Sequence, residues 1–256
     1  MSGTAQWWAA VVLDHAPSDA PAAFCADLGP DGLLAGYRAG AFPMPAPDEY
    51  ALWMNEARYE EQVDEGTIAT PPGAGEDAFG VAWWCPDPRP VIPLTGARLG
   101  SRLARRLRNG DLWTTTADKA FGEVVERCAA GRTPAWLTAD LRAALEALHA
   151  RGRAHSIEVW EEGELVGGAF GVRVGPVISL DSMFGMRPDA ARVAVVDLAQ
   201  RLSEAGGLLL DVQWDSPHVR SLGAVPRPRT EYLALLRGGP SAGPPPGEER
   251  PASRLG

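Results

Sequence analysis

The feature that most constrains the fold is a run of three apolar segments separated by two-residue turns. Each segment is rich in β-branched and aromatic residues, and the turns read Glu-Gly and Gly-Pro. Such spacing predicts an antiparallel meander, because two-residue loops containing glycine join antiparallel strands. The predicted strands lie at 155–160, 164–174 and 177–184.

A helix and one more strand follow the meander. Pro188 occupies a position favoured in a first helical turn, and Gly206 one where helices stop. The apolar segment 207–213 then reads as a buried strand, and earlier helices are predicted at 117–130 and 138–151. This order predicts an α+β fold. It resembles the core of GNAT-type N-acyltransferases, in which the strand after the long helix lies beside the third strand of the meander.

The domain organisation follows from shifts in composition. We expect a small N-terminal domain over 1–80, which includes a Pro-, Gly- and acid-rich insertion at about 46–80. The meander and its helices then form a catalytic domain over 81–237. The last residues, 238–256, contain little that could form a core and predict a disordered tail.

Composition excludes several classes of protein. The chain has 24 Lys+Arg against 33 Asp+Glu and a net charge of −9, so it is not a generally basic nucleic-acid-coating protein. Its three cysteines form no C-x-x-C, which disfavours a disulfide framework or a cysteine zinc site. The first basic residue is Arg38 and no apolar run approaches 18 residues, so we expect no signal peptide and no membrane span. We therefore expect a cytoplasmic protein without a metal.

Two constellations of polar residues near strand ends are candidates for catalytic chemistry. Asp211 and Gln213 close the last predicted strand, where residues two apart share a face, and the carboxylate could polarise the amide or hold a proton relay. A strand-end aspartate that caps the next turn is the alternative. Asp181 lies in an otherwise apolar strand, and if the strands pair as expected it lies near Asp211. Its alternative is a solvent-facing residue at the sheet edge.

An arginine-rich helix predicted over 98–107 and several tryptophans could bind nucleic acid. Guanidinium groups can bind phosphates bidentately, although a solvated helix face is the alternative. Trp136 and the pair Trp83-Trp84 could stack on bases, or could belong to the core. The arginines that recur on one side of this helix are Arg98, Arg102, Arg105 and Arg106.

Familiar catalytic motifs are missing from the sequence. There is no Walker A loop, no G-x-S-x-G and no H-E-x-x-H. In a GNAT-like fold the turn before the long helix would cradle the CoA pyrophosphate. Here the segment 185–194 has a single glycine and carries a proline, so a backbone cradle for phosphates is not expected. We expect no cofactor.

Several segments together resemble the leucyl/phenylalanyl-tRNA–protein transferase family, over roughly residues 20–237. The most specific are AHSIEVWEEGELVGG and the later D-x-Q and H-x-x-SLGA motifs. The resemblance implies transfer of Leu, Phe or Met from charged tRNA to the N-terminal Arg or Lys of a protein, which marks that protein for N-end-rule degradation. The matching segments are 31–43, 83–92, 101–107, 154–172, 181–184 and 209–224.

The resemblance also implies roles for individual residues. Asp211 and Gln213 would assist deprotonation of the acceptor α-amine, and Asp181 would bind the cationic acceptor. The arginine helix would bind the acceptor stem, and the protein would be a monomer. The positions implied to bind substrate are Trp136, which contacts the terminal adenosine, with Met183, Phe184, Ser216, His218 and Met44.

This sequence departs from the family pattern mainly around the site. Asp181 stands where Glu is usual, Met44 where Trp is usual, and Ser216 where Asn is frequent. Ala191-Arg192 replaces Ser-Lys at the start of the long helix. Three alternatives therefore stay open: a charged-tRNA-dependent transferase that acts on a small-molecule amine, an inactive binder of the tRNA end, and a CoA-dependent N-acyltransferase.

Overall fold

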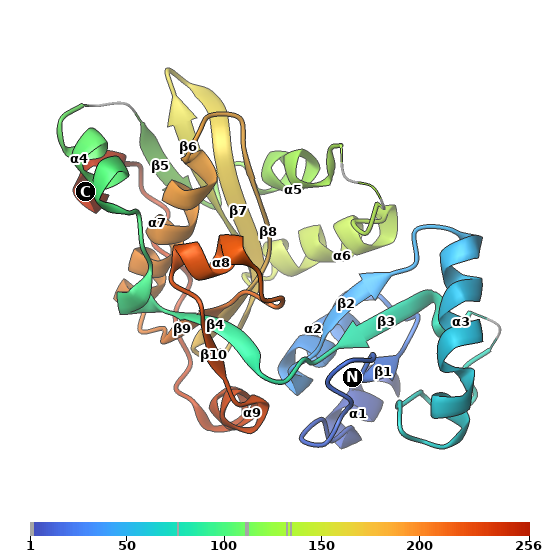
Figure 1. Cartoon of the computed structure of the whole chain (residues 1–256). Helices are drawn as coiled ribbons and strands as arrows, with labels where there is room; N and C mark the ends of the chain where they lie inside the picture. The colour runs from blue at the N-terminus through green and yellow to red at the C-terminus, as the bar shows by residue number, and fades with distance from the viewer. Residues whose placement is uncertain (1–2, 76, 111–112, 132, 134) are drawn as a thin grey trace. The chain divides into compact units, whose positions relative to one another are not determined.

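The computed structural model describes residues 3–75, 77–110, 113–131, 133 and 135–256. The chain divides into two compact units, each built from segments distant in sequence (Figure 1). Unit 1 comprises Met1–Arg89, Gly131–Leu148 and Arg227–Gly238, and unit 2 comprises Pro90–Ala130, His149–Pro226 and Gly239–Gly256. The protein is α+β, as the sequence predicts.

Unit 1 packs helices around a three-stranded antiparallel sheet of order β1-β3-β2. Trp83 on β3 is fully buried, and its indole N–H donates to Cys25 O at 2.9 Å. The expected insertion contains a 16-residue helix, α3, whose Tyr59 packs with Phe24 and Phe79. The elements are α1 (Gly3–Ala10), β1 (Ala23–Phe24), α2 (Pro30–Ala39), β2 (Phe42–Pro45), α3 (Glu49–Asp64), η1 (Ala78–Gly80), β3 (Val81–Trp84), most of α6 (Ala139–Ala150) and α9 (Arg229–Gly238).

Unit 2 is built on a mixed sheet of order β10-β4-β9-β8-β7-β6-β5-β11. The predicted meander is confirmed: β6, β7 and β8 pair antiparallel in sequence, and β9 lies parallel to β8. The elements are β4 (Arg89–Pro93), η2 (Leu94–Gly96), α4 (Ser101–Arg108), β5 (Thr114–Ala117), α5 (Phe121–Ala129), β6 (Ala154–Glu161), β7 (Glu164–Val174), β8 (Val177–Gly185), α7 (Ala190–Glu204), β9 (Leu209–Asp211), α8 (Pro217–Leu222), β10 (Val225–Arg227), β11 (Arg250–Pro251) and η3 (Ala252–Leu255).

The first meander turn shows why the register is fixed. Glu162 and Gly163 join β6 to β7 with φ of 51° and 84°. Two consecutive left-handed residues make a type I′ turn, whose twist matches that of the flanking strands. A one-residue slip would turn every apolar side chain to the other face.

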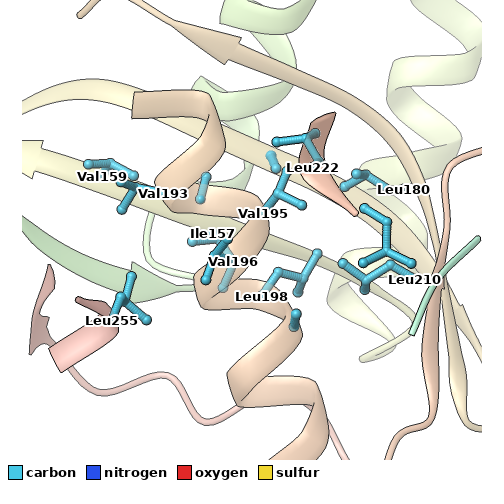
Figure 2. Close-up of a cluster of buried hydrophobic side chains, with 14 of the residues drawn as sticks. Ile157, Val159, Leu180, Val193, Val195, Val196, Leu198, Leu210, Leu222 and Leu255 are labelled. Carbon is cyan, nitrogen blue, oxygen red and sulfur yellow. The ribbon is translucent and has the colours of Figure 1, made fainter. Parts of the chain in front are cut away.

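The main core of unit 2 lies between α7 and the sheet. Figure 2 shows side chains of α7 packed against those of β6, β8 and β9. Burial of an aliphatic side chain stabilises the fold by roughly 1.5–3 kcal/mol, so this layer holds the meander and β9 together. Its labelled members are Ile157, Val159, Leu180, Val193, Val195, Val196, Leu198, Leu210, Leu222 and Leu255.

The C-terminal segment differs from the expected disordered tail. β11 pairs antiparallel with β5, and Leu255 of η3 joins the core. Arg201 of α7 is fully buried and donates to Glu248 O at 2.9 Å, while Arg254 pairs with the buried Asp197. Composition misleads here because buried polar side chains of α7 bind the segment, and because its few apolar residues, Ala242, Ala252 and Leu255, are buried in the core. Among the described residues, no helix is long and apolar enough to cross a membrane.

Candidate active site

The candidate site lies where β8 and β9 run side by side (Figure 1). The parallel register sets Ser179 of β8 opposite Asp211 of β9. Asp211 is fully buried; its Oδ2 accepts from Ser179 Oγ at 3.0 Å, and its Oδ1 from Gln213 N at 3.0 Å. Two donors compensate in part for removing a carboxylate from water. Asp211 therefore caps the backbone N–H of Gln213 after the strand and also contacts the hydroxyl of Ser179.

Gln213 reaches this cluster for a reason other than strand alternation. β9 ends at Asp211, and Gln213 has φ of 62°, in the left-handed region. Its Nε2 donates to Asp181 Oδ1 at 2.6 Å and to Ser179 Oγ at 3.2 Å. The prediction that Asp211 and Gln213 lie together is confirmed. The assumption that both belong to one extended strand is wrong.

A β-bulge places Asp181. Gly171 of β7 pairs with Leu180, and its neighbour Phe170 pairs with Ser182, so Asp181 is the extra residue of β8. A Cβ at Gly171 would lie 2.1 Å from Ser179 O, so the close approach of the strands there requires glycine. A bulge redirects a side chain that regular pleating would send elsewhere. Asp181 is consequently half-buried and contacts Gln213 instead of facing solvent at an edge.

Together these contacts form a continuous path of hydrogen bonds from Asp211 through Ser179 and Gln213 to Asp181. Both N–H groups of the Gln213 amide are used, and among the described residues its Oε1 accepts no hydrogen bond. Gln213 is 7% exposed. The amide oxygen can therefore accept a hydrogen bond from the N–H of a substrate, and the Asp181 carboxylate can bind a cation.

Ser179 is the member of this cluster that the sequence analysis missed. It lies two residues before Asp181 on a strand, a spacing that places side chains on one face of a regular strand. A polar residue at that spacing in an otherwise apolar strand was an available signal.

The remaining predicted substrate residues of unit 2 lie on β8 and α8. Met183 is half-buried and packs against the α7 core, and Phe184 is also half-buried. Ser216 is the N-cap of α8 and accepts from Val219 N at 3.2 Å. His218 is exposed on the same helix. Ser216 thus has a structural task of its own, because a serine N-cap satisfies an otherwise unpaired helix N–H.

The arginines of α4 differ in their surroundings. Arg102 and Arg105 are exposed, and Arg98 is exposed just before the helix. Arg106 lies 3.6 Å from Asp189, and its guanidinium lies 5.5 Å from the centre of the Trp113 ring. A cavity of about 630 Å³ opens between α4 and the start of α7. Its lining includes Arg102, Arg106, Asp189 and Arg192.

Two predicted substrate-binding residues, Met44 and Trp136, belong to unit 1. Met44 lies on β2 and is half-buried, and Trp136 is half-buried just before α6. Trp83 is fully buried and Trp84 packs against a small core cluster. The tryptophan pair therefore belongs to the core and not to a stacking surface.

A second buried carboxylate lies in the meander, outside the predicted site. Glu158 of β6 is fully buried and accepts from Ser156 Oγ and Thr116 Oγ1, each at 2.5 Å. Thr116 in turn accepts from the Trp160 indole N–H at 2.8 Å. Burial raises the pKa of Glu158 above its ordinary value, and the two hydroxyl donors oppose that shift. No group of three or more His, Cys, Asp or Glu side chains able to hold a metal occurs in the described part of the chain.

Comparison with known proteins identifies the family. Residues 91–237 match the family model described as leucyl/phenylalanyl-tRNA protein transferase. The chain belongs to this family. It is 38% identical over 245 residues to the leucyl/phenylalanyl-tRNA–protein transferase of Syntrophotalea carbinolica, covering 92% of each chain. It is 37% identical over 213 residues to the transferase of Rhodopseudomonas palustris BisB18, covering 82% of this chain and 80% of the relative. The transferase of Rhizorhabdus wittichii is 39% identical over 212 residues, with 82% and 74% covered.

Proposed function

We propose that this protein transfers Leu, Phe or Met from aminoacyl-tRNA to the N-terminal Arg or Lys of acceptor proteins. Family membership together with the path from Asp211 to Asp181 carries the proposal. The product would carry a new N-terminal residue that marks it for N-end-rule degradation.

The reaction needs positioning and modest proton transfer. The acceptor α-amine attacks the ester carbonyl carbon of the charged tRNA, a C–N bond forms, and the C–O bond to the terminal ribose breaks. The amine loses a proton and the ribose oxygen gains one. Gln213 Oε1 accepts an amine N–H and so directs the nitrogen lone pair at the ester, while Asp181 binds the side-chain cation of the acceptor. Asp211 stabilises this arrangement through Ser179.

The tRNA contacts would come from the arginine helix. Arg102 and Arg105 are exposed, and the cavity beside Arg102 and Arg106 also carries Arg192. Guanidinium groups suit backbone phosphates, and such contacts are independent of base sequence. Trp136 would contact the terminal adenosine and Met44 would bind substrate, as the family resemblance implies.

We also propose that unit 2 is a GNAT-like core. The antiparallel meander, the long helix α7 and the parallel pairing of β9 with β8 support this assignment. The segment before α7 contains Pro188 and the carboxylate of Asp189, which lines the adjoining cavity. The segment 185–194 has Gly185 as its single glycine and so offers no glycine-rich backbone cradle for a pyrophosphate, and we propose no CoA site and no cofactor.

The test is transfer of radiolabelled Leu, Phe and Met from charged tRNA to a peptide that begins with Arg. We expect label on the peptide with the natural protein and none with Asp211→Ala. No label despite tight binding of charged tRNA would contradict the proposal and favour an inactive tRNA-end binder.

A second candidate is transfer to a small-molecule amine. Asp181, where the family usually has Glu, is the observation that favours it, because a shorter carboxylate changes the reach toward a cationic acceptor. Screening amines against Arg- and Lys-peptides separates the two. A charged-tRNA substrate would place either reaction in the cytoplasm, and we propose that the protein acts there as a monomer.

A further inference from the structure

Ser179 connects the two halves of the candidate site. Its side chain is buried, with the residue 4% exposed on β8. Its hydroxyl contacts Asp211 Oδ2 at 3.0 Å and Gln213 Nε2 at 3.2 Å. In the proposed reaction Ser179 touches neither the ester nor the amine.

The direction of these hydrogen bonds is determined by the chemistry of the partners. A hydroxyl has one hydrogen, and a carboxylate can only accept, so Ser179 donates to Asp211. It must then accept from Gln213, which requires an N–H of the amide on that side. Asp181 imposes the same requirement on the second N–H, since a flipped amide would set two acceptor oxygens 2.6 Å apart.

We infer that Ser179 is a positioning residue that holds the Gln213 amide with Oε1 toward the acceptor amine. This inference rests on the proposed function. Asp211 Oδ1 accepts from the backbone N–H of Gln213 at 3.0 Å, and this contact does not orient the side-chain amide. The hydroxyl of Ser179 is the group through which the carboxylate acts on that side chain.

The test compares Ser179→Ala with a matched control on the same strand. Ser182 is 6% exposed, and its hydroxyl has no hydrogen-bond partner in the described part of the chain. We expect Ser179→Ala to lower kcat about 10-fold with KM for an Arg-peptide unchanged, because the lost hydrogen bond orients a catalytic group without binding substrate. Ser182→Ala should match the natural protein, and Ser179→Thr, which keeps the hydroxyl, should restore kcat.

A double-mutant cycle separates orientation of the amide from a general effect on the fold. If Ser179 acts through Gln213, Ser179→Ala should cause no further loss of kcat in a Gln213→Met background. The inference is overturned if the two substitutions lower kcat independently, so that their factors multiply in the double mutant. It is also overturned if Ser179→Ala leaves kcat unchanged, or if Ser179→Ala and Ser182→Ala lower kcat equally. If the natural protein transfers nothing, the proposed function fails and the inference with it; transfer that is insensitive to Ser179 overturns the inference alone.

Discussion

Replacing Gln213 with methionine is the sharpest test of the site. Methionine keeps the length of the side chain but removes both N–H donors and the amide oxygen. The natural side chain donates to Asp181 Oδ1 at 2.6 Å and to Ser179 Oγ at 3.2 Å. The substitution therefore removes the hydrogen bonds by which the Gln213 amide connects Asp181 to Ser179.

The size of the effect follows from the charge of the partner. A hydrogen bond to a charged group contributes roughly 1.5–3 kcal/mol net, and a factor of ten in rate corresponds to about 1.4 kcal/mol. If the amide acts in the transition state, Gln213→Met should lower kcat by about 10- to 150-fold. Asp181 also loses a donor, which should reduce the free energy of unfolding by about 1–3 kcal/mol.

The assay is single-turnover transfer of labelled Leu from charged tRNA to a peptide that begins with Arg. Gln200→Met is the matched control, because Gln200 is a half-buried glutamine on α7 that accepts from Arg254 at 3.4 Å. Urea unfolding of both variants checks the fold. A transfer rate for Gln213→Met within twofold of the natural rate, in a folded protein, would refute the role of the amide.

Three further predictions address the core, the buried carboxylate and the tRNA surface. Arg201→Met should lower the free energy of unfolding by about 3–5 kcal/mol in urea titrations. It removes the 2.7 Å partner of the buried Asp197, which keeps only Arg254 among its described ion pairs, and it removes the hydrogen bonds to Glu248 O and Thr115 O. Arg220→Met, in an exposed pair, should lower it by under about 1 kcal/mol. Equal effects would contradict this account. Because burial raises the pKa of Glu158, the folded state binds its proton more tightly than the unfolded state does. The contribution of Glu158 to stability is therefore greatest below the usual pKa of about 4.3 and falls as the pH rises toward the raised pKa. As the pH is lowered from about 7 to about 4, the free energy of unfolding of the natural protein should rise relative to that of Glu158→Gln. A flat or opposite trend in this difference would refute the prediction. The double substitution Arg102→Ala with Arg105→Ala should weaken binding of charged tRNA by a similar factor for different tRNAs. The slope of log K against log salt concentration should fall by about one unit for each lost phosphate contact. Unchanged affinity in filter binding would show that this helix face is only solvated.

The regular part of unit 2 could be predicted from the sequence because it is strongly periodic. The strand bounds expected for the meander agree with β6, β7 and β8 to within one residue at each end. Glycine-containing two-residue turns and alternating apolar residues are local signals, so they survive in a single sequence. The pairing of β9 with β8 was expected from the resemblance of this order of elements to the GNAT core, and it is present.

Unit 1 and the C-terminal segment could not be predicted because their contacts are distant in sequence. Unit 1 includes Gly131–Leu148 and Arg227–Gly238, which composition gives no reason to join to the first 89 residues. Arg229, for example, donates to Cys85 O at 2.7 Å across 144 positions. Arg201 and Asp197 of α7 bind the last residues of the chain. Both side chains are fully buried, and nothing in the sequence of this helix indicates that its charged residues are buried.

The site itself is formed where the backbone leaves regular geometry. Asp181 is the extra residue of a bulge, Gly171 permits the close approach beside it, and Gln213 has a positive φ after the strand has ended. Periodicity assumes regular pleating, so it can name these polar residues but not the directions in which they point. Gln213, at a position with positive φ, contacts Ser179 and also Asp181, the extra residue of the bulge. The hydrogen-bond path therefore depends on the bulge at Asp181 and on the backbone conformation of Gln213 as well as on the four side chains, and a single sequence shows only the side chains.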